Sequence, residues 1–300
     1  MELLYRFADD AQFVNTEIVP WVLRLVMIGL GLSLTIADFR RVVVYPKAAS
    51  IGLTAQLLGL PLAAFVLAQL FDAPPAIAIG LVILAACPSG VTSNAYSFAA
   101  KADVPLCVTL SAVSSVVTVF TIPLVIDFAL EVFGDEAGTA SIAASTMLLN
   151  LATLTVLPLA LGMTARWLLP DFAERALEPV RRAVFALMIA VLILALIASL
   201  EEIVDSFAVA GALVIAMNLL TMALGYGLAR AFRLPLPQVV TITFEVGVQN
   251  LALALAIAYN ILQRPDLAVA ALLYSAVMPA TALAFVSVSR RMLTSAAPTA

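Results

Sequence analysis

The sequence of 300 residues has no histidine, two cysteines, two lysines and few charges of either sign. Without histidine the chain cannot build bis-histidine haem ligation, a histidine proton relay or an ordinary zinc site. Lys47 and Lys101 lie beside hydrophobic runs rather than inside them, which argues against a retinal-type Schiff base in mid-membrane. Cys87 and Cys107 fall in apolar segments and offer neither a disulfide framework nor a metal spacing. Net charge is −4 with no basic block, so we expect no nucleic-acid partner.

Hydrophobic residues, in contrast, dominate the chain. They make up 64% of it and charged residues 11%, whereas soluble domains average about 45–50% apolar and about a quarter charged. A membrane-spanning helix uses about 20 apolar residues. The composition therefore predicts an all-α polytopic membrane protein whose residues 1–300 form a single transmembrane unit, with the lipid bilayer as a partner.

Hydropathy and helix breakers divide the chain into nine predicted transmembrane helices. They are 17–36, 48–71, 75–100, 104–130, 142–165, 180–200, 206–230, 236–262 and 267–289. Alternate loops place 12 of the 15 basic residues on one side, and acidic loops such as the one with Glu201 and Glu202 lie on the other. The positive-inside rule then predicts a multi-pass protein of the cell (inner or plasma) membrane, with its N-terminus outside and its C-terminus in the cytoplasm.

Two of these segments are interrupted by polar and helix-breaking residues. The third contains CPSGVTSN (87–94) and the eighth contains EVGVQN (245–250). A carboxylate such as Glu245 in mid-membrane costs at least about 2.5 kcal/mol, and no Lys or Arg except Arg24 is expected at comparable depth. Unwound backbone at that depth is tolerated only when it lines a cavity or is buried in protein. The first stretch alone is also compatible with a proline kink whose freed carbonyls bind Ser and Thr side chains.

The two interruptions are also related by their spacing and direction. Asn94 precedes Pro123 by 29 residues, and Asn250 precedes Pro279 by 29 residues. Four predicted spans separate the two segments, so they cross the membrane in opposite directions. This pattern predicts an inverted-repeat transporter whose two discontinuous helices cross at the midplane. Two repeats of five helices would make ten, so we expect the first helix of the first repeat to be missing.

The side chains around these breaks suit a small hard cation. Sodium prefers about five or six oxygen ligands from carboxylates, amides, hydroxyls and unwound carbonyls. A carboxylate with two bound sodium ions has a net charge of +1 in a low-dielectric cavity, which would attract a monoanionic organic solute. The oxygen set comprises Thr92, Ser93, Asn94, Ser111, Glu245, Gln249 and Asn250.

CPSGVTSN with the following KADVPLCVTLSAVSS, EVGVQN, and the opening GLSLTIADFRR…YPKA resemble the bile acid:sodium symporter family, in its nine-span form. The resemblance runs from about residue 16 to 290. It implies a core domain of about 48–130 and 206–289 and a panel domain of about 17–36 and 142–200. A cleft open to the cytoplasm would lie between the two domains.

Carried over position by position, the resemblance implies two sodium sites that share Glu245. Asn94 and Asn250 would link the sodium ions to the substrate, with Thr92 beside them. The chain departs from the family pattern at Cys107, where a serine is common, and at Ser89, where CPGG has glycine. The first site would comprise Ser93, Asn94, Cys107, Ser111 and Glu245, and the second Gln56, Glu245, Gln249 and the carbonyls of Val246 and Val248.

The sequence therefore predicts a sodium-coupled symporter that imports an organic anion, such as a bile acid or other small carboxylate, by alternating access. Proton coupling through Glu245 and a non-transporting receptor for an amphipathic carboxylate are the alternatives. No Ser–His pair or paired acids at one depth indicate an enzyme, and we expect no cofactor beyond the coupling ion. Arg24 has two interpretations, snorkelling to headgroups or contact with the anion. Asn150 and Asn218 are expected to hydrogen-bond between helices.

Overall fold

The computed structural model describes residues 13–134, 143–198 and 200–295, and every regular element within them is a helix. The α-helices are α2 (Val19–Ser33), α3 (Ile36–Val44), α4 (Pro46–Thr54), α5 (Leu60–Leu70), α6 (Pro75–Ala86), α7 (Val91–Ala100), α8 (Val104–Phe133), α9 (Ala144–Leu151), α10 (Leu157–Leu168), α11 (Pro170–Ala198), α12 (Leu200–Ala231), α13 (Leu236–Gly247), α14 (Leu251–Ala256) and α15 (Val269–Ser295). Four π-helical turns, η1 (Val14–Ile18), η2 (Ala55–Gly59), η3 (Ala152–Val156) and η4 (Ile257–Ile261), and the 3₁₀ turn η5 (Pro265–Ala268) extend or join them.

The helices agree with the predicted membrane segments in position. Seven stretches of the described residues are long and apolar enough to cross a membrane, and the bent pair of α6 and α7 raises the number to eight. The remaining predicted segment, 180–200, falls largely in α11, where many side chains lie outside the described residues. The all-helical class is confirmed, while the nine-span count and the inverted repeat stay predictions.

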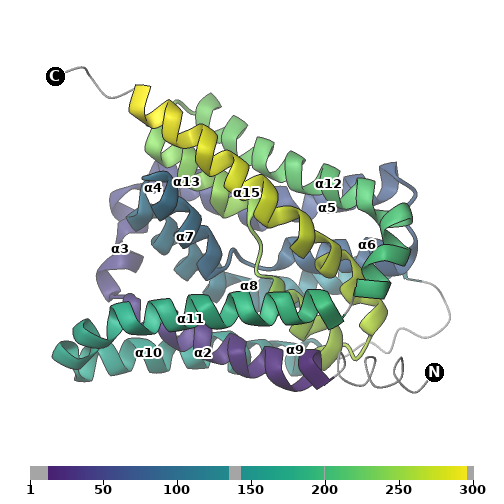
Figure 1. Ribbon diagram of the computed structural model, residues 1–300, viewed down its shortest axis with the longest axis horizontal. Helices are drawn as coiled ribbons and strands as arrows, with labels where there is room; N and C mark the ends of the chain where they lie inside the picture. The colour runs from purple at the N-terminus through teal and green to yellow at the C-terminus, as the bar shows by residue number, and fades with distance from the viewer. Residues whose placement is uncertain (1–12, 135–142, 199, 296–300) are drawn as a thin grey trace.

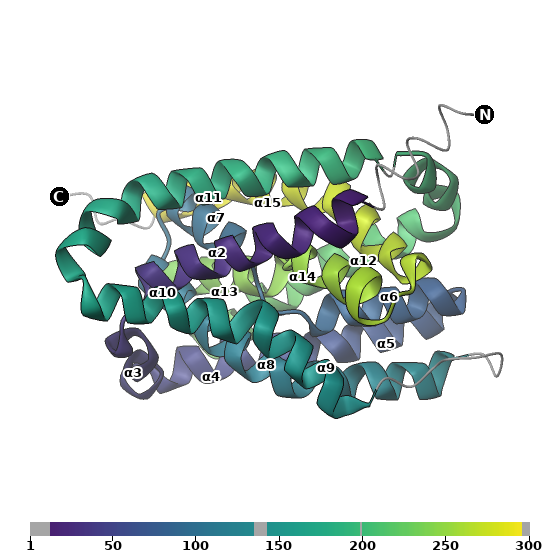
Figure 2. The same ribbon diagram turned by 90° about the horizontal axis from the view of Figure 1, so that it is seen from below.

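A buried span lies in the middle of the helices. In Figure 1, α2, α10 and α11 run side by side along the lower edge, while α12 and α15 cover the upper part. Figure 2 shows α13 and α14 lying behind α2, between the helices at the two edges. In the stretch Leu236–Ile261, 94% of the most apolar window is buried inside the protein. Because this span is surrounded by other helices, it can carry polar residues without exposing them to lipid.

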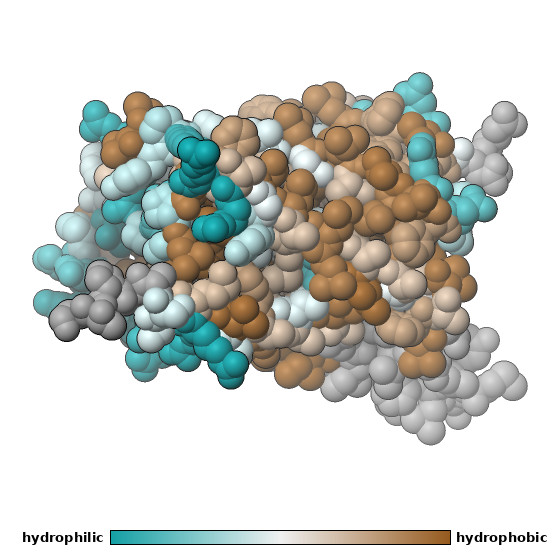
Figure 3. Space-filling view, turned by 90° about the horizontal axis from the view of Figure 1, so that it is seen from above, coloured by the Kyte–Doolittle hydropathy of each residue, from teal (hydrophilic) through white to brown (hydrophobic). Residues whose placement is uncertain are grey.

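The outer surface is largely apolar, as expected of a face that contacts lipid. Leu58, Leu62 and Leu70 are 65–75% exposed, and Figure 3 shows hydrophobic side chains over much of the face in view. Hydrophilic side chains gather at the end where Figure 1 places the C-terminal end of α15. Soluble monomers rarely expose such a continuous apolar surface, so the surface supports the membrane assignment.

Two glycines allow α2 and α10 to approach each other closely. A Cβ atom added to Gly31 would overlap the carbonyl oxygen of Leu159, and one added to Gly162 would overlap that of Ile28. The same added atom at Gly162 would lie 2.8 Å from the backbone nitrogen of Leu32. Small residues at helix contacts let backbones pack tightly in membranes, so this pair holds α2 against α10.

We predict that Gly162→Ala destabilises the protein by about 1–3 kcal/mol, because the added methyl group overpacks a backbone contact. Thermal unfolding in detergent measures the effect as a lower Tm. Gly227→Ala is the matched control, since a Cβ atom there meets nothing within 4 Å. Removing a helical glycine at this open position should leave Tm unchanged or raise it. An unchanged Tm for Gly162→Ala would contradict the packing account.

Candidate functional site

The third predicted segment is a broken helix rather than a kinked one. α6 ends at Ala86, residues 87–90 are not helical, and α7 starts at Val91 with its axis bent by 64°. Pro88 lacks an N–H group, and a residue before proline disfavours the helical region, which agrees with ψ of 147° at Cys87. A simple proline kink, the alternative left open by the sequence, does not describe this geometry.

The eighth segment breaks at the predicted place. α13 ends at Gly247, and Val248 is extended with φ −112° and ψ 114°. α14 then begins at Leu251, with the side-chain Oδ1 of Asn250 accepting a hydrogen bond from the N–H of Leu253 at 3.1 Å. Asn250 therefore acts as the N-cap of the second half-helix.

The two breaks contact each other directly. The backbone N–H of Asn250 donates to the carbonyl of Pro88 at 3.0 Å. The side-chain Nε2 of Gln56, in the π-helical turn η2, donates to the carbonyl of Cys87 at 3.1 Å. Backbone groups freed from one helix thus find partners on the other interrupted helix and on η2, as an apolar environment requires. We call this meeting point, residues 87–90 and 247–250, the crossing.

Glu245 lies beside the crossing and is almost fully buried, with 1% of its surface exposed. Its Oε1 accepts hydrogen bonds from the hydroxyls of Ser89 and Ser111, the latter at 2.9 Å. Its Oε2 accepts from the hydroxyl of Ser93 at 3.1 Å and from the thiol of Cys107 at 3.1 Å. These donors come from α7, α8 and the break. Within the described residues no Lys or Arg forms an ion pair with this carboxylate.

A second polar group lies at the crossing itself. The amide Nε2 of Gln249 donates to the carbonyl of Val246 at 2.8 Å, and Nε2 of Gln56 approaches Oε1 of Gln249 at 3.5 Å. Val248 N–H closes the last turn of α13 by donating to Phe244. The structure therefore brings Gln56, Val246 and Gln249 together, while their cation-binding role and that of the Val248 carbonyl stay predictions.

Among the described residues, two oxygens buried at this site have no hydrogen-bond partner. They are Oε1 of Gln56 and Oδ1 of Asn94. An unpaired buried acceptor costs roughly 1–3 kcal/mol, and a cation that reaches it removes that cost. The donor set of carboxylate, amide, hydroxyl and carbonyl oxygens fits sodium, whereas the sulfur of Cys107 is a poor ligand for it. Cys107 instead donates to the Glu245 carboxylate.

Three cavities lie along α2, and the second of them is at the crossing. The Arg24 cavity, about 240 Å³, is lined by Glu17 and Arg24 among others, and the crossing cavity, about 60 Å³, by Thr92 and Asn250. The Asn94 cavity, about 410 Å³, is lined by Asn94 and by Ser33 at the other end of α2. Predicted substrate residues therefore line two adjoining cavities. Asn250 lines the crossing cavity while its Oδ1 also caps α14.

The sequence marked Ser89 only as a departure from the glycine of the family pattern. The structure places its hydroxyl on Oε1 of Glu245 and 3.0 Å from the hydroxyl of Ser111. The signal available was a hydroxyl side chain inside the break of an otherwise apolar helix, which has few other partners at that depth.

Tyr274 and Asn218 form a second group that sequence reasoning did not connect with the site. The hydroxyl of Tyr274 donates to the carbonyl of Gly247 at 2.8 Å and accepts from Nδ2 of Asn218 at 2.9 Å. Nδ2 of Asn218 also donates to the Gly247 carbonyl at 3.3 Å. The prediction that Asn218 bonds between helices is confirmed. We call this group the Gly247 clamp, because it holds the carbonyl between those of Val246 and Val248.

Comparisons with known proteins agree with the geometry. The sequence model described as the Sodium Bile acid symporter family matches residues 20–206. The P3 protein of Homo sapiens is 30% identical over 263 residues, which cover 86% of this chain and 54% of that protein. The chain thus spans about half the length of this relative.

Two further relatives have names that specify sodium. The uncharacterized sodium-dependent transporter YocS of Bacillus subtilis is 26% identical over 236 residues, covering 79% of this chain and 72% of that protein. The ileal sodium/bile acid cotransporter of Homo sapiens is 27% identical over 246 residues, covering 81% and 69%. Since the family match extends over more than half of the 300 residues, the chain belongs to the sodium bile acid symporter family.

Proposed function

We propose that this protein is a sodium-coupled symporter that imports a small organic carboxylate by alternating access. Two sodium ions bind at the crossing and share the Glu245 carboxylate between them. Ser93, Asn94 and Ser111 surround the first ion, with Cys107 holding the carboxylate. Gln56, Gln249 and the carbonyls of Val246 and Val248 surround the second.

The observation that carries the proposal is the environment of Glu245. Its carboxylate is 1% exposed and is contacted by three hydroxyls and a thiol, which orient a negative charge but do not neutralise it. An uncompensated buried charge is costly. Cations entering beside it would meet the unpaired oxygens of Gln56 and Asn94. Sodium therefore completes a site that the protein alone leaves unbalanced.

The charge count explains why an anion would follow the cations. One carboxylate and two sodium ions leave a net charge of +1, which is weakly screened in a low-dielectric interior. A carboxylate solute near Asn94 and Asn250 would stabilise the bound sodium, and sodium would strengthen binding of the solute by the same factor. This reciprocity is the physical basis of symport.

The cavities support transport over a receptor that only binds its ligand. α2 lines the Arg24, crossing and Asn94 cavities in turn, and the one with the smallest volume lies at the crossing. We assign α2 and α9–α11 to a panel domain and the remaining helices from α4 to α8 and α12 to α15 to a core domain. A movement of core against panel would open the crossing to one side at a time.

The distribution of basic residues sets the proposed orientation. α3 and the C-terminal ends of α10 and α15 lie at the same end of the bundle (Figure 1), and these segments contain Arg40, Arg166 and Arg290. By the positive-inside rule this end faces the cytoplasm. The Asn94 cavity then opens toward the cytoplasm and the Arg24 cavity toward the outside, in the cell membrane.

We predict that Glu245→Gln abolishes sodium-stimulated uptake while the protein still inserts in the membrane, because the neutral amide no longer attracts sodium. Uptake of radiolabelled pyruvate and glycocholate into proteoliposomes under an inward sodium gradient provides the measurement. Glu131→Gln is the matched control, since Glu131 lies exposed near the end of α8. Uptake driven by a proton gradient without sodium would instead support proton coupling through Glu245.

We predict that Tyr274→Phe weakens sodium binding about fivefold, because loss of one hydrogen bond of about 1 kcal/mol loosens the Gly247 clamp. The sodium concentration that gives half-maximal thermal stabilisation, with potassium keeping ionic strength constant, reports this affinity. Tyr226→Phe is the control, since the ring of Tyr226 packs edge-on against Phe285 and its hydroxyl lies outside the clamp. A Tm lowered equally in sodium and in potassium, with an unchanged sodium midpoint, would show that the clamp is only structural.

A further inference from the structure

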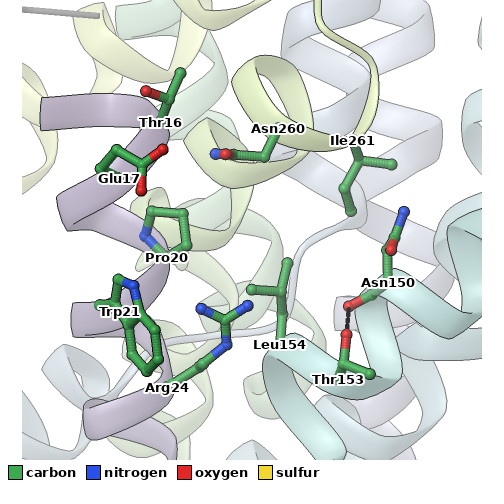
Figure 4. Close-up of a pocket in the computed structure, with 10 residues that line it drawn as sticks. All are labelled: Thr16, Glu17, Pro20, Trp21, Arg24, Asn150, Thr153, Leu154, Asn260 and Ile261. Atoms are coloured by element: carbon green, nitrogen blue, oxygen red, sulfur yellow. Dashed lines mark hydrogen bonds between the residues drawn. The ribbon is translucent and has the colours of Figure 1, made fainter. Parts of the chain in front are cut away.

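The Arg24 cavity carries charged side chains that the sodium sites do not use. It forms where η1 and α2 meet the turns η3 and η4, and Glu17, Arg24, Asn150 and Asn260 are among its lining residues (Figure 4). In Figure 4 the guanidinium of Arg24 points into the space between Trp21 and Leu154.

The guanidinium is held in place, and no carboxylate of the described residues forms an ion pair with it. Its central carbon lies 4.9 Å from the ring centroid of Trp21, a cation–π contact that fixes its position. Within the described part of the chain it forms no ion pair with a carboxylate. In the Asn94 cavity, by contrast, Arg182 is already paired with Glu178 at 2.9 Å. An arginine without a carboxylate partner, inside a cavity, is suited to bind one from a ligand.

Glu17 lines the same cavity and places a negative charge at its other end. It lies seven residues before Arg24, about 10 Å along the helix axis, and Figure 4 shows it near Thr16 and Asn260. The two charges are therefore separated. A ligand with its carboxylate at Arg24 and a neutral hydrogen-bonding group toward Asn260 meets both ends favourably, whereas a dianion would be repelled by Glu17.

We propose that the Arg24 cavity is an entry site that binds the carboxylate of the solute on the outer side before it reaches the crossing. The inference rests on the proposed function for its direction, since entry from outside presupposes import. A cavity of about 240 Å³ accommodates a small organic monocarboxylate, or the carboxylate end of a larger one. Lining residues come from α2 and η3 on one side and η4 on the other, so movement between these groups would open and close the site.

Asn150 is also part of the proposed entry site. Its backbone carbonyl accepts a hydrogen bond from the hydroxyl of Thr153 at 2.9 Å, drawn as a dashed line in Figure 4. The predicted bond from its side chain to another helix is not found among the described residues. The side chain lines the Arg24 cavity instead, where its amide can contact a bound solute.

The two tryptophans of the chain, Trp21 and Trp167, allow a binding test that does not depend on transport. A Trp167→Phe variant leaves Trp21, next to Arg24, as the only tryptophan emitter. This variant in lipid nanodiscs is titrated with pyruvate and glycocholate, with uncharged pyruvamide as the ligand control. We expect a saturable change in Trp21 emission with at least one carboxylate and none with pyruvamide.

Substitutions of the two charged residues then separate the outcomes. Arg24→Gln should raise the carboxylate concentration at the midpoint of the Trp21 titration at least about tenfold, as expected for loss of a charge-assisted contact. Glu17→Gln, the matched control in the same cavity, should leave the midpoint unchanged or lower it. An unchanged midpoint in Arg24→Gln, or no saturable change with either carboxylate, would overturn the proposal. Anionic lipid in the nanodisc could abolish the carboxylate titration in the parent protein but not in Arg24→Gln. That result would assign the cavity to a lipid headgroup and would also overturn the proposal.

Sodium-driven uptake by the parent protein distinguishes this inference from the proposed function. If the parent protein shows sodium-driven uptake, but the midpoint of the Trp21 titration is the same in Arg24→Gln, the entry site alone is refuted. A Trp21 signal that depends on Arg24, without any sodium-driven uptake, would refute the symporter and leave the anion site standing.

Discussion

The structure depends on the contact between two helix breaks that satisfy each other's backbone. In an apolar interior, a peptide group released from a helix must find a new partner or the break is unstable. Here the N–H of Asn250 binds the carbonyl of Pro88, and Gln56 covers the carbonyl of Cys87. Because one break donates to the other and η2 donates to the first, neither break is satisfied by its own helix. The polar groups beside them acquire fixed positions as a consequence.

Glu245 shows how this arrangement leads toward function. A buried carboxylate is retained only when something offsets its charge, and the contacts of Glu245 are neutral donors. The Gly247 clamp holds the carbonyl at the end of α13, where the unwound segment begins. The protein therefore holds oxygen atoms in place around a charge that it does not itself balance, and a mobile cation is the simplest complement.

The sequence predicted the broad architecture because its signals are strong. Pro88 with Gly90, and Gly247 followed by Asn250, interrupt apolar runs that are otherwise long enough to span a membrane, and both breaks are where they were predicted. Glu245 could be placed among hydroxyls because so few polar side chains exist at that depth. Side-chain direction could not be predicted, since the sequence does not show which way an unwound residue turns. Ser89 was therefore missed, as was the use of Asn250 as a helix cap.

Direct binding of radioactive sodium to the purified protein, without any organic solute, tests the central claim most directly. The account predicts saturable binding that unlabelled sodium displaces and potassium does not. Absence of saturable binding at millimolar sodium, or displacement by potassium as effective as that by sodium, would contradict it.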